Sequence, residues 1–278
     1  MNELFESFLQ DRLYLKNVSS LTIKSYRQAF ERFKKGGGAE ASKQTVNDFV
    51  VYMRSSGLSP VTCNISIRSM NSFLSWLFEC GHIREPLKIK QLRTEKKVIK
   101  PYSDTELSRI VSFRPNTLAQ RRLHALLCTL VECGCRIDEL LSLKRSDLDF
   151  DNLYIVVFGK GKKERIVPIS VELRKVLFKF LRVHDFEFVF GSKHGKADYR
   201  SLIRQWRNLC GRLGIEYRGF HSLRHNYGLN FIKQGGDISE LRRLLGHSSI
   251  TTTAMYVNLQ TEDLRRAHAR TSILSRLR

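Results

Sequence analysis

The sequence predicts a mainly α-helical protein with a small antiparallel sheet, organised as two domains. Apolar residues recur at a spacing of about 3.6 along most of the 278 residues, which is typical of amphipathic helices. Two short runs rich in β-branched and aromatic residues, 153–158 and 165–168, flank a glycine-containing turn and predict a hairpin. A charged, proline-containing stretch at 84–101 interrupts the helical pattern and predicts a boundary between two domains, each long enough to bury a core.

The first domain, residues 1–83, is predicted to be a bundle of four helices. Each apolar stripe ends at a glycine or at a short polar turn, and Ser59-Pro60 is a typical helix start. The loops between the stripes are short, which suits a compact helical bundle. The four predicted helices span 4–13, 21–33, 42–54 and 61–80.

The stretch 84–101 is predicted to be an interdomain linker. It contains Pro86 and Pro101, is rich in Lys and Arg, and has weak periodicity. Two interpretations of this stretch remain open. The linker is either a solvated connector or a segment that crosses the phosphates of a nucleic acid.

The second domain, residues 102–278, is predicted to begin with the capping box Ser103–Glu106. A long apolar helix over 118–133 ends at Gly134, and a further helix starts at Arg136. The predicted hairpin follows, with a basic turn at 159–164. From residue 170 onward the pattern is helical again, including a C-terminal helix over 261–275.

Composition restricts the partners of this chain. There are 48 Lys and Arg against 27 Asp and Glu, so the formal net charge is +21, which favours a polyanion. We expect no membrane association, because no stretch approaches 18 uncharged apolar residues and the N-terminus lacks a signal pattern, and we expect a cytoplasmic location. The six cysteines form no disulfide framework, and Cys133-x-Cys135 is too tightly spaced for a zinc pair, so no metal is predicted.

A His and a Tyr, His247 and Tyr256, lie nine residues apart near the end of this basic chain. Tyrosine can act as a covalent nucleophile, and a phosphodiester is the electrophile that a basic protein is suited to hold. On one straight helix the two side chains would be roughly 13 Å apart, so a turn at Gly246 and Ser248 or Ser249 is needed to bring them together. The pattern predicts DNA breakage and rejoining through a phosphotyrosine, although a tyrosine on a helix is most often a core residue.

Cationic candidates occur upstream of this pair. His221 and Arg224 stand at i and i+3 and therefore share one helix face, whereas His225 is interpreted as structural. Arg136 follows a glycine break, although an ion pair with a neighbouring acidic residue would also explain it. Lys160 lies between the two glycines of the hairpin turn, where a solvated tip is the simpler alternative. Arginine suits a phosphate because its planar fork binds two oxygens and keeps its charge.

Taken in order, these motifs resemble the tyrosine recombinase/integrase family, most closely its simple Xer-like and small integrase members. The resemblance covers nearly the whole chain and implies an N-terminal four-helix SAM-like core-binding domain followed by an α+β catalytic domain. It also implies that Tyr256 attacks the scissile phosphate to give a 3′-phosphotyrosine, on the way to a Holliday junction. The other implied catalytic residues are Arg136, Arg224 and His247 at the transition state, Lys160 as general acid and His221 as general base.

The resemblance implies partners as well. We expect double-stranded DNA with a specific, inverted-repeat site, no cofactor, and a tetramer on two synapsed sites, with accessory proteins in some reactions. The helix at 261–275 is expected to dock onto a neighbouring subunit, the alternative being packing on its own domain. The candidate DNA contacts in the linker and the hairpin are Lys96, Lys97, Lys162, Lys163 and Arg165.

Two other functions remain open from the sequence. A type IB topoisomerase uses similar chemistry at nearly any sequence and would relax DNA as a monomer. A catalytically silent DNA-binding clamp would keep the fold without the reaction. The reaction itself could be integration, excision or resolution.

Overall fold

The computed structural model describes residues 1–95, 100–159 and 164–246. The chain divides into two compact units, Met1–Lys97 and Val98–Arg278, and each is described by itself. Within the described ranges, none of the helices combines the length and the apolar character that crossing a membrane requires.

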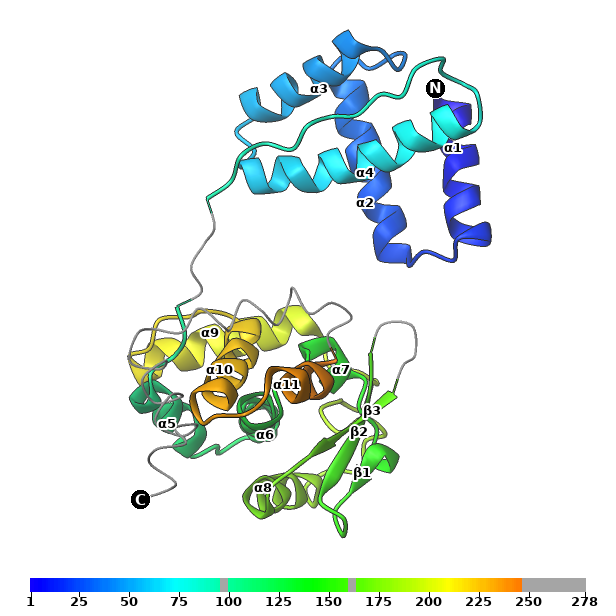
Figure 1. Ribbon diagram of the computed structural model, residues 1–278. Coiled ribbons are helices and arrows are strands. Elements are labelled where there is room, and N and C mark those ends of the chain that lie inside the picture. The colour runs from blue at the N-terminus through cyan, green and yellow to red at the C-terminus, as the bar shows by residue number, and fades with distance from the viewer. Residues whose placement is uncertain (96–99, 160–163, 247–278) are drawn as a thin grey trace, which may run out of the picture. The chain divides into compact units, whose positions relative to one another are not determined.

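The first unit consists of helices followed by an extended segment (Figure 1). Serine side chains at positions 19, 42 and 59 each accept a hydrogen bond from a backbone N–H in the first turn of the following helix, which fixes where three of the helices begin. Pro60 occupies the first turn of the last helix, where its missing N–H costs nothing. The elements are α1 (Asn2–Gln10), a π-helical turn (Asp11–Leu15), α2 (Ser20–Lys35), α3 (Lys43–Ser55) and α4 (Pro60–Glu79).

Aromatic rings form the centre of this unit. The rings of Phe5 and Phe30 stack with their centroids 3.9 Å apart, and the ring of Phe73 meets both edge-on at 5.2 and 5.7 Å. All three side chains are buried. Stacked and edge-to-face contacts of this kind add to the stabilisation from apolar burial and hold α1, α2 and α4 together.

The first part of the predicted linker packs on the first unit. The amide of Asn71 pairs with the backbone N–H and carbonyl of Ile89 at 2.8 and 2.9 Å, and Asn64 holds Leu92 in the same way. The Ile89 side chain is buried in the core of this unit. These paired amides hold an extended segment, which has no helical periodicity, on the first unit. Because this segment belongs to the first unit, the boundary between the two units falls near residue 97.

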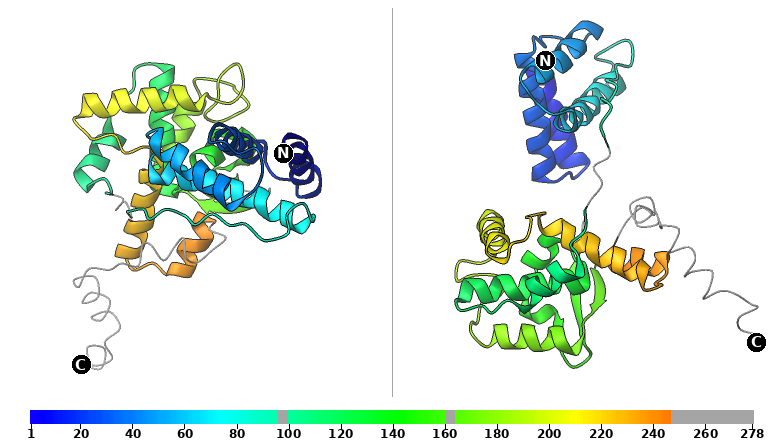
Figure 2. Two further views of the ribbon diagram at one scale, coloured as in Figure 1. Left: turned by 90° about the horizontal axis from the view of Figure 1, so that it is seen from above. Right: turned by 90° about the vertical axis from the view of Figure 1, so that its left-hand side faces the viewer.

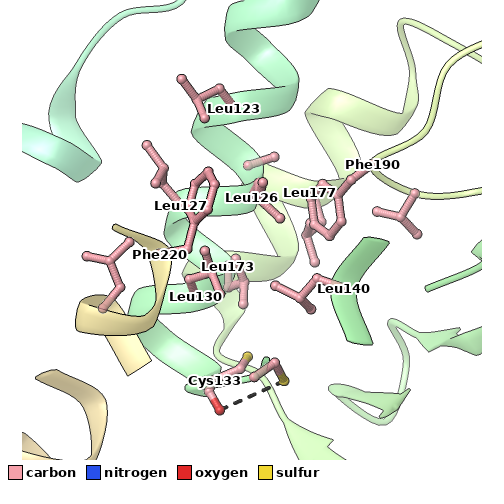
Figure 3. Close-up of a cluster of buried hydrophobic side chains, with 14 of the residues drawn as sticks. Leu123, Leu126, Leu127, Leu130, Cys133, Leu140, Leu173, Leu177, Phe190 and Phe220 are labelled. Atoms are coloured by element: carbon pink, nitrogen blue, oxygen red, sulfur yellow. Dashed lines mark hydrogen bonds between the residues drawn. The ribbon is translucent and has the colours of Figure 1, made fainter. Parts of the chain in front are cut away.

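The central helix of the second unit is α6 (Leu118–Cys133). It packs against α5 (Asp104–Ser112), α8 (Val171–Leu181), α9 (Tyr199–Leu213) and α10 (Phe220–Lys233). Figure 3 shows the buried side chains of Leu126, Leu127 and Leu130 from α6 between those of the neighbouring helices. The predicted capping box at the start of α5 is confirmed, because the side chains of Ser103 and Glu106 each accept a hydrogen bond from the other residue's backbone N–H.

A three-stranded antiparallel sheet lies beside these helices (Figure 1). Its strands are β1 (Leu148–Asp149), β2 (Tyr154–Phe158) and β3 (Glu164–Pro168), in the order β1-β2-β3. The hairpin pairs Val157 with Arg165, which sets the face of the sheet that Arg165 occupies. The described unit also contains α7 (Ile137–Leu141), a 3₁₀ turn (Arg145–Asp147) and α11 (Ile238–Leu245). The helix α11 comes directly after α10 in the chain and contacts it (Figure 2).

Two parts of the second unit differ from the prediction. The sequence did not predict β1, whose two residues pair with β2. The expectation of helix from residue 170 onward is wrong for 182–198, which lies between α8 and α9. There the backbone bonds to the segment after α7, and the Arg145 side chain donates to the carbonyls of Leu181 and His184 at 3.0 and 2.7 Å. These contacts between distant parts of the chain override the local helical pattern.

Candidate active site

Gly134 forms the sharp turn between α6 and α7 and thereby places Arg136 at the start of α7. It ends α6 in the left-handed conformation, with φ of +58°. A Cβ at this position would also come within 2.4 Å of the Tyr227 ring. Glycine is therefore required here both by the backbone conformation and by the packing of α10 against the turn.

Replacing Gly134 with alanine is expected to destabilise the protein more than the matched change Gly214→Ala. Gly214 ends α9 with φ of +63°, but a Cβ there would meet nothing within 4 Å. Both variants incur left-handed strain of about 1–2 kcal/mol. The first should lose about 1–3 kcal/mol more from the collision with Tyr227. Equal losses in the free energy of unfolding, measured in urea, would contradict the packing argument.

Arg136 and Glu139 form an ion pair at the start of α7. The Arg136 guanidinium donates to Glu139 Oε1 at 2.9 Å, and the Arg136 backbone N–H donates to Glu139 Oε2 at 2.8 Å. Burial opposes ionisation of Glu139, but hydrogen bonds from Arg165 and Arg136 outweigh it and hold the pKa of this carboxyl below its ordinary value. The Arg136 side chain remains 39% exposed, so part of the guanidinium still faces solvent.

Arg165 completes the hydrogen bonding of the same carboxylate. Its two terminal nitrogens donate to Glu139 Oε1 and Oε2 at 2.9 and 2.7 Å, and its Nε donates to the Leu244 carbonyl at 2.8 Å. The sequence predicted Arg165 as a DNA contact. The structure differs from that expectation, because only 13% of the side chain is exposed and all three nitrogens donate within the protein.

Arg224 is the most deeply buried charged side chain of the site. It projects from α10, is 1% exposed, and donates to the carbonyls of Gly134 and Leu245 at 2.7 Å each. Arg136 also reaches this end of α11, where it donates to the Leu245 carbonyl at 3.5 Å and to the Gly246 carbonyl at 3.2 Å. Arg136 and Arg224, which are predicted from the sequence to act on the same phosphate, therefore meet at the same carbonyl oxygen.

The last turn of α11 is thus surrounded by cations. Its carbonyl end carries partial negative charge, which arginine side chains stabilise. The helix ends at Gly246 in the left-handed conformation, as the sequence predicted. The described part of this cluster consists of Arg136, Arg165, Arg224 and Glu139, so it carries a net positive charge. The end of α11, which these arginines bind, lies immediately before His247 in the chain.

His221 lies one helical turn before Arg224 on α10, at the surface. Its pKa is lowered from the ordinary value by partial desolvation first, and then by the positive charges of Arg224 and Arg136. Its ring meets that of His225 edge-on, with centroids 4.5 Å apart. Burial, His221 and Arg224 lower the pKa of His225 to about 4, so His225 is neutral at neutral pH.

The described site therefore joins three of the predicted catalytic residues: Arg136, His221 and Arg224. The remaining predicted catalytic and DNA-binding residues lie outside the described ranges; they are Lys96, Lys97, Lys160, Lys162, Lys163, His247 and Tyr256. Among the described residues there is no group of three or more His, Cys, Asp or Glu that could hold a metal ion.

The role of Glu139 was not predicted from the sequence. There, Glu139 is only one of two acidic neighbours that could pair with Arg136. The capping-box spacing, with a glutamate three residues after Arg136, was the available signal, because it places a carboxylate against the first backbone N–H of α7. The second partner, Arg165, is 26 residues away in sequence and gives no local signal.

Comparisons with known proteins agree on one family. Residues 87–263 match the model of the phage integrase family. The tyrosine recombinase XerA of Thermococcus onnurineus is 31% identical over the whole of this chain and 98% of its own length. The tyrosine recombinase XerD of Listeria monocytogenes is 29% identical over 93% of this chain and 95% of its own length.

Solved structures give the same result for the fold. A crystal structure of XerA recombinase shares 25% identity, covers 98% of both chains and has a TM-score of 0.54. The integrase of the Tn1549 transposon, solved in complex with transposon right end DNA, covers 97% of this chain and 99% of its own with a TM-score of 0.79. At 17% identity, this second likeness shows a common fold alone.

Proposed function

The chain belongs to the phage integrase family, and from that membership we propose that it is a site-specific DNA recombinase that cuts and rejoins strands through a 3′-phosphotyrosine. The single observation that best supports the chemistry is the meeting of Arg136 and Arg224 at the Leu245 carbonyl. Two guanidinium groups that share one acceptor are close enough to share one phosphate.

In the proposed cleavage step, the Oη of Tyr256 forms a bond to phosphorus while the bond from phosphorus to the 5′ oxygen breaks. Lys160 protonates the departing 5′ oxygen, and His221 accepts the tyrosine proton. The lowered pKa of His221 supports this role, because a neutral imidazole is needed to accept a proton. Arg136, Arg224 and His247 stabilise the negative charge that builds on the non-bridging oxygens. No cofactor takes part, since the phosphotyrosine conserves the energy of the broken bond.

The rest of the architecture is assigned in the same proposal. The helical first unit is a four-helix SAM-like core-binding domain, and residues 102–278 form the catalytic domain. The duplex is gripped through Lys96, Lys97, Lys162 and Lys163, and the net charge of +21 supports a large electrostatic contribution to binding. Four copies act on two inverted-repeat sites in the cytoplasm, and the helix at 261–275 docks onto a neighbouring copy. Accessory proteins take part in some reactions.

The proposal is tested by covalent trapping on a library of nicked random duplexes and fragmented genomic DNA. The wild type and Tyr256→Phe are incubated with the library and denatured in SDS, and the DNA that stays linked to protein is sequenced. The expected result is enrichment of one short inverted-repeat site, with no adduct in the Phe variant. Tyrosine-dependent adducts on all sequences would point to a topoisomerase, and DNA binding without any adduct to a silent clamp. Either result would overturn the proposal.

A further inference from the structure

Arg165 lies at the centre of the hydrogen-bond network that joins the catalytic candidates, although it faces away from bulk solvent. It projects from β3 and binds two elements at once, the Glu139 carboxylate of α7 and the last turn of α11. Substitution of Gly246 would bring a Cβ within 3.0 Å of Arg165 Nη1, so the end of α11 packs directly on this side chain.

The shared carboxylate couples Arg165 to Arg136. Glu139 is 4% exposed, and each of its oxygens accepts one hydrogen bond from Arg165 and one from Arg136. Without Arg165, the buried carboxylate would depend on Arg136 alone. The Arg136 guanidinium would then be held by Glu139, and less of its charge would be available to a phosphate.

The second coupling runs through the end of α11. Arginines bind the carbonyls of its last two residues and of the following Gly246: Leu244 accepts from Arg165, Leu245 from Arg224 and Arg136, and Gly246 from Arg136. The Leu244 contact is the one made by a side chain anchored in the sheet. Arg165 therefore ties the strand that follows the Lys160 turn to the helix that precedes His247.

We propose that Arg165 is a positioning residue for the recombination reaction: it holds Glu139 and the end of α11 so that the Arg136 guanidinium is presented to the scissile phosphate. This inference rests on the proposed function. It replaces the phosphate contact that the sequence predicted for Arg165, and it requires that loss of Arg165 slows strand cleavage in DNA complexes that still form.

The test compares Arg165→Gln with the wild type on the duplex that the trapping library yields. DNA affinity is measured by titration, and adduct formation by single-turnover cleavage of a nicked duplex at saturating protein. Arg165→Gln should leave affinity nearly unchanged and slow adduct formation by at least about tenfold, as expected when one transition-state cation is misplaced. Arg165→Lys, which keeps the charge but not the fork, should fall between the two.

A methylphosphonate at the scissile position separates positioning from general damage. Replacing one charged oxygen by a methyl group removes the charge that Arg136 has to neutralise. Arg165→Gln and Arg136→Ala should therefore both lose much less on this neutral duplex than on the phosphodiester. An equal loss on both duplexes would mean that Arg165 acts only through overall structure, and would overturn the proposal.

Arg145→Gln is the matched control. Arg145 is also partly buried and also binds the carbonyl end of a helix, but its guanidinium donates to Leu181 and His184 rather than to Glu139. It should lower the melting temperature without slowing cleavage by bound protein. A similar slowing in this control, or weaker DNA binding by Arg165→Gln with normal cleavage once bound, would contradict the inference. If the wild type itself forms no adduct, the proposed function is wrong. If the wild type forms the adduct and only the expected effects of Arg165→Gln are missing, the positioning role alone is wrong.

Discussion

Replacing Arg224 with alanine is expected to slow strand cleavage strongly and to destabilise the second unit. The side chain is 1% exposed and donates to the carbonyls of Gly134 and Leu245. Leaving both carbonyls without this donor should lower the free energy of unfolding by about 2–6 kcal/mol. Removing one cation from the transition state should slow adduct formation by a further factor of about 10²–10³ in protein that remains folded.

Arg224→Lys separates the two effects. Lysine keeps the positive charge but cannot donate to the two carbonyls with the geometry of a planar fork. Its unfolding free energy and its rate of adduct formation should both lie between those of the wild type and the alanine variant. The measurements are urea denaturation and single-turnover cleavage at a temperature where each variant is folded. An alanine variant that cleaves at the wild-type rate would exclude Arg224 from the active site.

Glu139→Gln is expected to cost about 3–5 kcal/mol of stability, which is typical when one partner of a buried ion pair is lost. The amide keeps one acceptor oxygen, but its NH₂ group would face the donors of Arg136 and Arg165. The neighbouring change Asp138→Asn, at an exposed position of the same helix, is the matched control and should have little effect. Similar losses in the two variants would contradict the proposed network.

The difference between the wild type and Glu139→Gln should depend on pH. The pKa of Glu139 is lowered in the folded protein, so its charged form stabilises the fold. That contribution is fully present above the ordinary pKa of 4.5 and is lost as the pH falls through the lowered folded value. Chemical denaturation of both proteins between pH 7 and the acid limit of folding should show the gap narrowing only below about pH 4.5. A gap that is independent of pH would exclude the ionised carboxylate as its source.

Local signals in the sequence predicted much of this structure. The capping box at Ser103, the left-handed glycines at 134 and 246, and the hairpin that carries Arg165 depend on short-range rules of backbone geometry. The spacing of His221 and Arg224 on one helix likewise follows from helical periodicity. Each of these features needs only a few neighbouring residues, which is why one sequence was sufficient.

Features that depend on distant contacts were not predictable in this way. The strand β1 exists because β2 pairs with it, and 182–198 stays non-helical because Arg145 and its neighbours bind it. The basic turn made Arg165 resemble a DNA contact, whereas the buried Glu139, 26 residues away, directs its guanidinium inward. No periodicity or motif in the sequence records that the two side chains meet.

The most direct test of the central claim is to identify the residue that becomes linked to DNA. The adduct formed by the wild type on its selected duplex is digested with nuclease and trypsin, and the modified peptide is sequenced by mass spectrometry. The tryptic peptide 244–265 contains a single tyrosine, Tyr256. A nucleotide attached to Tyr256 through its 3′ phosphate is the predicted result. Attachment to any other residue, or through a 5′ phosphate, would contradict the proposed mechanism.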